Sequence, residues 1–204
     1  MRFSRMLIGL SVVVLVTSAC SSATTQSASS KSLTSSPASV VLSTSSPRNG
    51  ETTFDIYLTG YSYWDNTPPG SAEISKPVIH RKAGGKGTYR DPITIAVGHT
   101  IIGNRQTLDF EAGTRFYIPN LRKYAIVEDV CGDGRNPQDG PCHTGYNGLP
   151  WLDIYVDGSG SRSGDATQCA RQITAVQQII MNPDRDYPVV SGALTETGCQ
   201  VFSG

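Results

Sequence analysis

Three short runs decide the fold of this chain: Arg115-Phe116-Tyr117-Ile118, Tyr124-Ala125-Ile126-Val127-Glu128-Asp129-Val130 and Leu152-Asp153-Ile154-Tyr155-Val156. Each run is rich in apolar residues and is bounded by Gly, Pro or Asn, so the pattern predicts strands joined by turns and loops. The second and third runs each carry an acid, Asp129 and Asp153, in otherwise apolar sequence. Such an acid either anchors the structure or is placed for chemistry.

The flanking sequence extends the β pattern in both directions. Between 165 and 181 the apolar residues recur at spacings of three and four, which predicts one amphipathic helix with Asp165 as its N-cap, ended by Asn182 and Pro183. No internal repeat is visible. Further strands are predicted at 53–58, 72–79, 93–97, 100–102, 106–110, 187–190 and 200–202.

The first twenty residues have the pattern of an export signal. A basic start precedes an apolar run at 6–16 that is too short to span a bilayer as a helix. Thr17-Ser18-Ala19-Cys20 follows and resembles a bacterial lipobox, with Cys20 as the lipidated residue; simple cleavage after Ala19 is the alternative. Residues 21–50 are rich in Ser, Thr and Ala and predict a disordered tether, so the folded domain is expected at 51–204.

Composition and cysteine usage narrow the function classes. The chain has 204 residues, and its 17 basic and 17 acidic residues balance, so nothing indicates a surface for nucleic acid.

Export implies an oxidising compartment. Four cysteines then allow three pairings, of which the local one, Cys131–Cys142 with Cys169–Cys199, is the simplest. A zinc site is disfavoured because no CxxC occurs and His143 is the only nearby imidazole.

Three motifs resemble the three-aspartate ("3D") and RlpA-like double-psi β-barrels, a superfamily with the lytic transglycosylase A barrel, expansins, barwins and family 45 endoglucanases. The resemblance implies a mainly β fold, a six-stranded double-psi β-barrel, to which the sequence adds one C-terminal helix. It also implies action on a cell-wall glycan. The motifs are Gly113-Thr114-Arg115-Phe116-Tyr117-Ile118-Pro119, Val127-Glu128-Asp129-Val130-Cys131 and Leu152-Asp153-Ile154-Tyr155.

The same resemblance implies roles for the two acids. Asp153 matches the aspartate that serves the lytic transglycosylase as general acid and base, and Asp129 is the natural second carboxylate. Two departures argue against carrying the activity over whole. The family's Asp-Thr-Gly reads Asp129-Val130-Cys131 here, and Ala96-Val97-Gly98-His99 stands where a third aspartate is expected. Glu128 should point away from Asp129 onto a solvated face.

Aromatic residues supply candidate sugar contacts. Trp151, Trp64 and Tyr63 lie at predicted strand ends, where a ring can stack on a sugar or fill the barrel core, and His99 follows a strand and is a candidate groove residue. The hypothesis is therefore an envelope enzyme, a peptidoglycan lytic transglycosylase or glycoside hydrolase. The alternatives are a non-catalytic polysaccharide-binding module and a protein that engages another protein. We expect a monomer without cofactor or metal, held by a lipid anchor and facing the periplasm or cell exterior.

Overall fold

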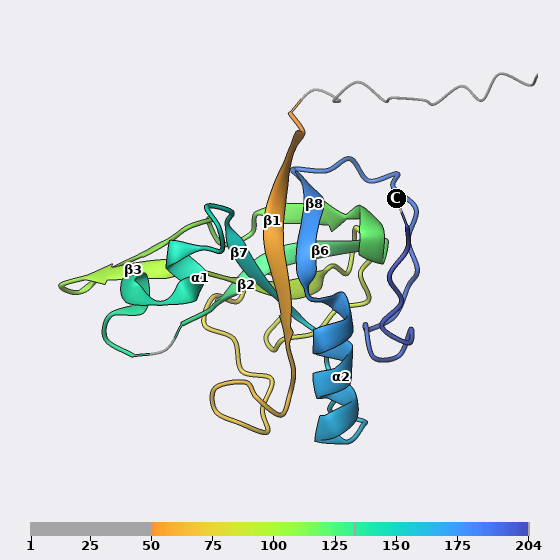
Figure 1. Cartoon of the computed structure of the whole chain (residues 1–204), viewed down its shortest axis with the longest axis horizontal. Coiled ribbons are helices and arrows are strands. Elements are labelled where there is room, and N and C mark those ends of the chain that lie inside the picture. The colour runs from red at the N-terminus through yellow and green to blue at the C-terminus, as the bar shows by residue number, and fades with distance from the viewer. Residues whose placement is uncertain (1–49, 133, 204) are drawn as a thin grey trace, which may run out of the picture. The chain divides into compact units, whose positions relative to one another are not determined.

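The structure is a computed structural model that describes residues 50–132 and 134–203 (Figure 1). The predicted signal peptide at 1–20, the lipidation site Cys20 and, apart from Gly50, the tether lie outside the described residues.

The domain is a closed six-stranded β-barrel, which confirms the predicted fold class. Around the barrel the order is β1–β7–β2–β6–β5–β8. The pairs β1–β7 and β2–β6 are parallel, and the other four pairs are antiparallel. The strands are β1 (Thr52–Tyr61), β2 (Ile93–Val97), β5 (Arg115–Ile118), β6 (Lys123–Val130), β7 (Trp151–Tyr155) and β8 (Ala175–Met181).

Closure depends on the length of β1. Its ten residues pair with β8 from Thr52 to Leu58 and with β7 from Tyr57 to Tyr61, so one strand bridges two neighbours. Alternate side chains fill the interior, because successive residues of a strand point to opposite faces. These interior residues are 0–1 % exposed and include Ile56, Leu58, Ile93, Ile95, Phe116, Ile118, Ala125, Val127, Leu152, Ile154 and Ile179.

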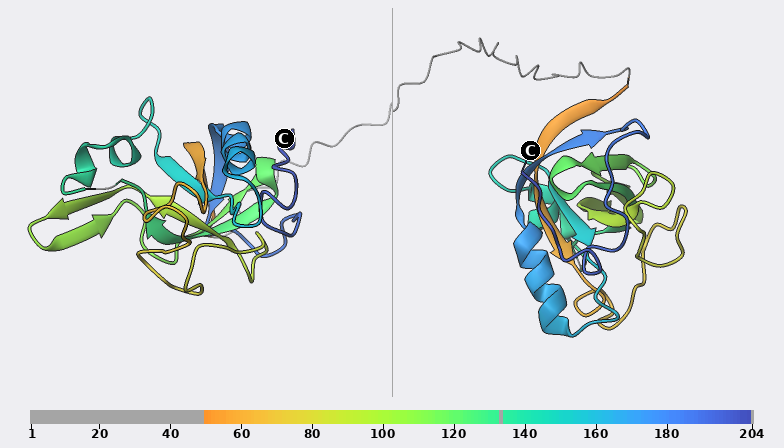
Figure 2. Two further views of the ribbon diagram at one scale, coloured as in Figure 1. Left: turned by 90° about the horizontal axis from the view of Figure 1, so that it is seen from below. Right: turned by 90° about the vertical axis from the view of Figure 1, so that its right-hand side faces the viewer.

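Smaller elements lie outside the barrel. A two-stranded hairpin of β3 (His99–Ile102) and β4 (Arg105–Leu108) extends away from it (Figure 2). Helix α2 (Ser163–Ile173) packs against β1. The remaining short elements are α1 (Pro141–Thr144) and the two 3₁₀ turns η1 (Pro119–Leu121) and η2 (Pro137–Asp139).

The predicted helix at 165–181 is wrong in its second half. The helix ends at Ile173, and the residues after it form β8, which closes the barrel. Residues 176, 179 and 180 are apolar and fit a helical spacing, but these residues form a strand because they pair with the free edge of β1. The N-cap is Arg162 and not Asp165; the two side chains form an exposed ion pair at 3.1 Å.

Three other predicted strands, at 72–79, 187–190 and 200–202, are irregular segments in the structure. The C-terminal segment lies along the barrel through isolated contacts, among them the Phe202 amide to the Asn120 carbonyl at 2.8 Å. The buried Lys123 ammonium donates to the carbonyls of Val190 and Gly192. Burial lowers the pKa of Lys123 to about 8. The carbonyls of Val190 and Gly192 thus bond to a side chain.

Both predicted disulfides are present. Cys169–Cys199 joins α2 to the C-terminal segment, and Cys131–Cys142 closes the loop between β6 and α1. The first connects segments 30 residues apart, so it restrains the end of the chain that follows β8.

The contact between α2 and β1 yields a prediction. A Cβ atom at Gly60 would lie 2.9 Å from Val156 Cγ1 and 3.2 Å from the Ala170 Cα, so Gly60→Ala should lower the free energy of unfolding by about 1–3 kcal/mol. Gly164→Ala, in the exposed first turn of α2 with open space around it, is the matched control and should be neutral or stabilising by up to about 1 kcal/mol. Urea unfolding without reductant measures both. Equal stability of the two variants would contradict the close packing.

Candidate functional site

Asp129 and Asp153 lie on opposite sides of Ala96 and face the same groove. Ala96 on β2 pairs with Asp129 of β6 on one edge and with Asp153 of β7 on the other. Residues paired in register point to the same face of a sheet, and the methyl group of Ala96 leaves space between the two acids. Both acids and Ala96 line a groove of about 370 Å³.

A β-bulge in β6 places Asp129 in this groove. Ala125 and Val127 pair with Ile93 and Ile95 and point into the barrel core. By the period of two, Asp129 would also point inward. The register shifts by one residue between Ile95 and Ala96, so Asp129 lies opposite Ala96 on the outer face.

Asp129 is held by three hydrogen-bond donors. Its Oδ1 accepts from the backbone N–H groups of Ser75 at 3.0 Å and Val130 at 2.9 Å, and its Oδ2 accepts from the Tyr61 hydroxyl at 3.1 Å. Burial and the neighbouring Asp129 charge raise the pKa of Tyr61 well above its usual value. Tyr61 therefore stays protonated and donates, and Asp129 has the environment of a fixed carboxylate.

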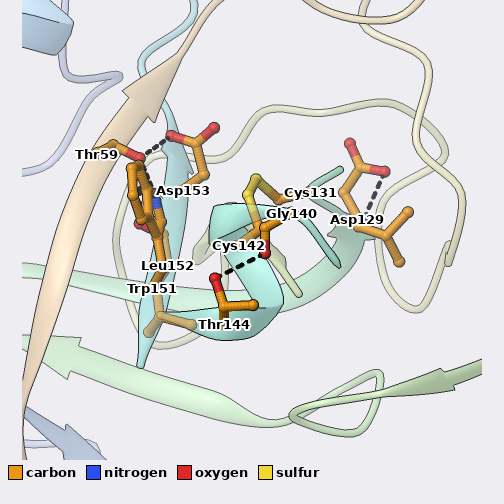
Figure 3. Close-up of a disulfide and its surroundings, with 10 residues drawn as sticks. Thr59, Asp129, Cys131, Gly140, Cys142, Thr144, Trp151, Leu152 and Asp153 are labelled. Carbon is orange, nitrogen blue, oxygen red and sulfur yellow. Dashed lines mark hydrogen bonds between the residues drawn. A yellow bond between two sulfur atoms is a disulfide. The ribbon is translucent and has the colours of Figure 1, made fainter. Parts of the chain in front are cut away.

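Asp153 has a different environment. Burial raises the pKa of Asp153 to about 7, and the negative charges of Asp65 and Asp129 act in the same direction. The Thr59 hydroxyl donates to Asp153 Oδ1 at 2.7 Å, which acts in the opposite direction. The Trp151 indole N–H donates to Thr59 Oγ1 at 2.7 Å, and Figure 3 shows this chain of contacts. Asp153 is thus a carboxyl group that exchanges a proton near neutral pH.

Two further acids of the groove were missed by the sequence analysis. Asp65 and Glu73 both line it, and both come from the long connection between β1 and β2. Asp65 is oriented by the backbone N–H and the hydroxyl of Ser62, each at 2.6 Å. The sequence reads as a turn at Asp65, and its place four residues after Tyr61 at the end of β1 was the available signal.

The remaining candidate residues do not gather in this groove. Tyr63 lies in a neighbouring pocket with Tyr155 and Asp157. Trp64 donates its indole N–H to the Gly158 carbonyl at 2.8 Å and is 39 % exposed. His99 is 3 % exposed, and burial lowers its pKa. Trp151 lines a third pocket and reaches Asp153 only through Thr59.

Glu128 is fully buried, so its prediction as a solvated residue is wrong. Its Oε1 accepts from the successive backbone N–H groups of Val78, Ile79 and His80, and its Oε2 lies 2.6 Å from His80 Nδ1. The other ring nitrogen of His80 lies 3.0 Å from Asp91. Glu128 and Asp129 together hold segment 75–80 beside the groove. Side chains therefore satisfy the amides of the segment that had been predicted as a strand.

Within residues 50–132 and 134–203, no helix is long and apolar enough to cross a bilayer. Across the same residues, no group of three His, Cys, Asp or Glu side chains is placed to hold a metal ion.

The comparisons with known proteins give a family. Residues 53–200 match the family described as DDB_G0273701 N-terminal domain. The chain belongs to this family. It is 36 % identical over 133 residues to a Dictyostelium discoideum protein that is named as uncharacterized, a match covering 65 % of this chain. The chain spans 52 % of the length of that relative. No solved structure matches.

The contact between His80 and Glu128 predicts a pH-dependent contribution to stability. Burial lowers the pKa of His80, but hydrogen bonds to Glu128 and Asp91 outweigh it and raise the pKa above 6.5. Burial likewise raises the pKa of Glu128, but the amide and imidazole donors outweigh it and lower the pKa below 4.5. The His80 contribution is complete below its unfolded pKa and is lost as pH rises through the folded pKa. The Glu128 contribution is lost as pH falls through its own folded pKa.

His80→Gln should therefore lower the free energy of unfolding by about 1.5–3 kcal/mol near pH 5.5 and by less at pH 9. Asp91→Asn, which removes only the more exposed partner, should show the same trend at smaller size. Urea titrations across pH 4.5 to 9 measure the difference. A destabilisation that stays constant over this range would show that the ring is held by packing and not by charge.

Proposed function

We propose that the protein acts on a cell-envelope glycan, with Asp153 as general acid and base, and that peptidoglycan is the substrate. The observation that carries the proposal is the contrast between the two acids of the groove. Asp153 is buried enough to hold a proton near neutral pH, while Asp129 across Ala96 accepts three hydrogen bonds. Two carboxyl groups with divergent environments are the usual basis for acid and base roles.

The architecture supports membership of the RlpA-like double-psi superfamily. The barrel has six strands, its two parallel pairs are β1–β7 and β2–β6, and the strands carrying Asp129 and Asp153 both pair with β2. Asp65 adds a third aspartate to the groove from a different element than the superfamily motif. The proposed membership rests on the barrel and on the position of Asp153 in its motif, and Asp65 has no counterpart in that motif.

The chemistry that fits this groove is lytic. Asp153 protonates the glycosidic oxygen and then takes a proton from a sugar hydroxyl that closes an anhydro ring, so one titrating carboxyl group suffices. Asp129, fixed by its three hydrogen-bond donors, lies across Ala96 and would face the positive charge that develops on the sugar. Two strand spacings, about 9–10 Å, separate the backbones of Asp129 and Asp153. This spacing leaves room for a substrate oxygen between them.

The second candidate is a non-catalytic module that binds cell-wall polysaccharide. It is supported by the hydrogen bonds that the Asp129 carboxyl group already accepts from the protein. Two of them come from the backbone N–H groups of Ser75 and Val130, as expected of a structural carboxylate. In that case the groove recognises sugar hydroxyls without cleaving a bond.

The location proposed for this activity is the cell envelope, with Cys20 as the lipid anchor and the domain outside the cytoplasm as a monomer. Two disulfides support an oxidising compartment, since such bonds persist outside the cytosol. The proposed partners are the membrane, through the lipid, and the polysaccharide, through the groove.

The catalytic proposal predicts that Asp153→Asn abolishes muropeptide release from purified sacculi by the full chain, a loss of at least about 100-fold. Asp55→Asn, an exposed aspartate on β1, is the matched control and should release at the parent rate. Activity of the parent should fall as pH rises above about 7, because the acid must be protonated. Equal release by the Asp153→Asn variant and the parent would remove Asp153 from the mechanism. No release by the parent would favour the binding module.

The Thr59 contact predicts a shift that needs no substrate. Its hydroxyl stabilises the ionised form of Asp153, so Thr59→Val should raise the pKa of Asp153 by about 0.5–1 unit above its parent value. Thr59→Ser keeps the hydroxyl and should titrate like the parent. The carbon-13 resonance of the Asp153 carboxyl, followed across pH 5 to 9, reports the change. An unshifted titration in Thr59→Val would show that this hydrogen bond does not tune the acid.

A further inference from the structure

The outer face of β7 continues past Asp153 to a second pocket. Trp151 and Asp153 are two residues apart on β7, so they share a face about 6.6 Å apart along the strand. On β1 their pairing partners are Tyr57 and Thr59, which share the same face. The pocket beside Trp151 has a volume of about 300 Å³. The groove of Asp153 and this pocket are therefore neighbours on one wall of the barrel.

The Trp151 ring is fixed in position. Its N–H is engaged by Thr59 at 2.7 Å, and Tyr57 contacts it edge-to-face with ring centres 4.7 Å apart. Tyr57 also stacks on Tyr146 at 4.2 Å, and Tyr146 is 41 % exposed. A partly exposed indole that is held by a hydrogen bond and a ring contact is a preorganised surface for a flat apolar ligand face.

The pocket that Trp151 lines also holds a histidine, His143, with one ring nitrogen available. His143 Nδ1 lies 2.6 Å from Asp109 Oδ1, and Nε2 has no partner among the described residues. The rest of α1 is rigid around it, because Cys142 is bonded to Cys131. A Cβ at Gly145 would lie 2.3 Å from the Leu149 carbonyl oxygen, which keeps the following turn tight. The imidazole is thus oriented by its hydrogen bond to Asp109 and lies on a short helix that a disulfide joins to Cys131.

The lining of the pocket selects for a neutral ligand. Among the described residues that line it, Asp109 and His143 are the only charged or titratable side chains, and they are paired with each other. The remaining side-chain surface is mostly apolar, and its one hydroxyl, on Thr144, donates to the Gly140 carbonyl at 3.1 Å. The other side chains are those of Phe110, Cys142, Leu149, Pro150 and Trp151. The described part of the lining therefore offers an anionic or cationic ligand no unpaired counter-charge. A ring with one apolar face and neutral hydrogen-bonding groups at its rim fits both the indole and the imidazole.

We propose that this pocket is a second sugar subsite, in which a ring stacks on Trp151 and one hydroxyl or acetamido group bonds to His143 Nε2. The inference rests on the proposed glycan activity and adds the length of the substrate: a chain of several sugars that spans the pocket and the acidic groove. When one sugar stacks on Trp151, the next sugar of the chain lies beside Asp153, two residues further along β7. Trp151 and His143 then position the bond that Asp153 protonates.

The test uses the two tryptophans of the chain as reporters. The full chain carrying Asp153→Asn, which prevents cleavage, is titrated with β-1,4-linked N-acetylglucosamine dimer or hexamer while the two indole N–H resonances are followed by nitrogen-15 NMR. Trp64→Phe assigns them. The hexamer should shift the Trp151 signal and leave the Trp64 signal in place. It should also bind at least tenfold more tightly than the dimer.

His143→Ala and Trp151→Ala should each weaken hexamer binding about tenfold, which corresponds to about 1.4 kcal/mol. Gln172→Ala, an exposed residue of α2, is the control and should bind like the parent. Hexamer binding that shifts the Ser75 amide but not the Trp151 indole would overturn the second subsite and leave the acidic groove in place. Full hexamer affinity in His143→Ala would also overturn it. Absence of binding by either oligomer would overturn the subsite, and muropeptide release measured separately would then decide the fate of the activity.

Discussion

The interior of a six-stranded barrel is filled by side chains, and this constraint determines where every other feature lies. Its core residues are sealed from solvent, so no ligand can enter, and polar chemistry is confined to the outer face and the loops. The bulge in β6 places the Asp129 side chain on the outer face of the barrel and not in its interior. Without the register shift at Ala96, the same strand would bury a carboxylate among Ile and Val side chains, where it could not be solvated.

The acids near the bulge have two different roles: Glu128 and Asp129 hold a backbone segment in place, and Asp153 has a raised pKa. Glu128 and Asp129 accept backbone N–H groups and fix segment 75–80, which would otherwise lack a sheet partner. Asp153 instead has one hydroxyl donor, and Asp65 and Asp129 are close enough to raise its pKa. Its ionised form opposes folding, because a raised carboxyl pKa means that stability is lost as pH rises from about 4 towards 7. A group that weakens the fold in this way is typical of a site kept for function.

The apolar runs at 115–118, 124–130 and 152–156, bounded by turn residues, predicted three of the strands, and the resemblance of these motifs to the RlpA-like family implied the six-stranded barrel. The prediction from sequence was wrong where contacts between distant parts of the chain determine the local structure. The apolar residues of 175–181 have a helical spacing, and it is the pairing with the free edge of β1 that makes this segment a strand. Glu128 looked solvated because its partners, three successive amides and His80, lie about 50 residues earlier in a loop with no pattern of its own. Asp129 and Asp153 were found because they interrupt strands, and Asp65 was missed because it lies in a turn.

The pairing of β1 with β8 has a consequence for how the chain reaches its native state. Thr52, near the start of the domain, pairs with Met181, near its end, so the barrel cannot be assembled from its N-terminal portion. Contacts of such sequence separation form late and make folding slow. A nascent polypeptide that has not yet been synthesised through β8 leaves β1 with an open edge, which is prone to pairing with other chains. A chaperone that binds the nascent chain until β8 has been synthesised would therefore protect this domain from aggregation.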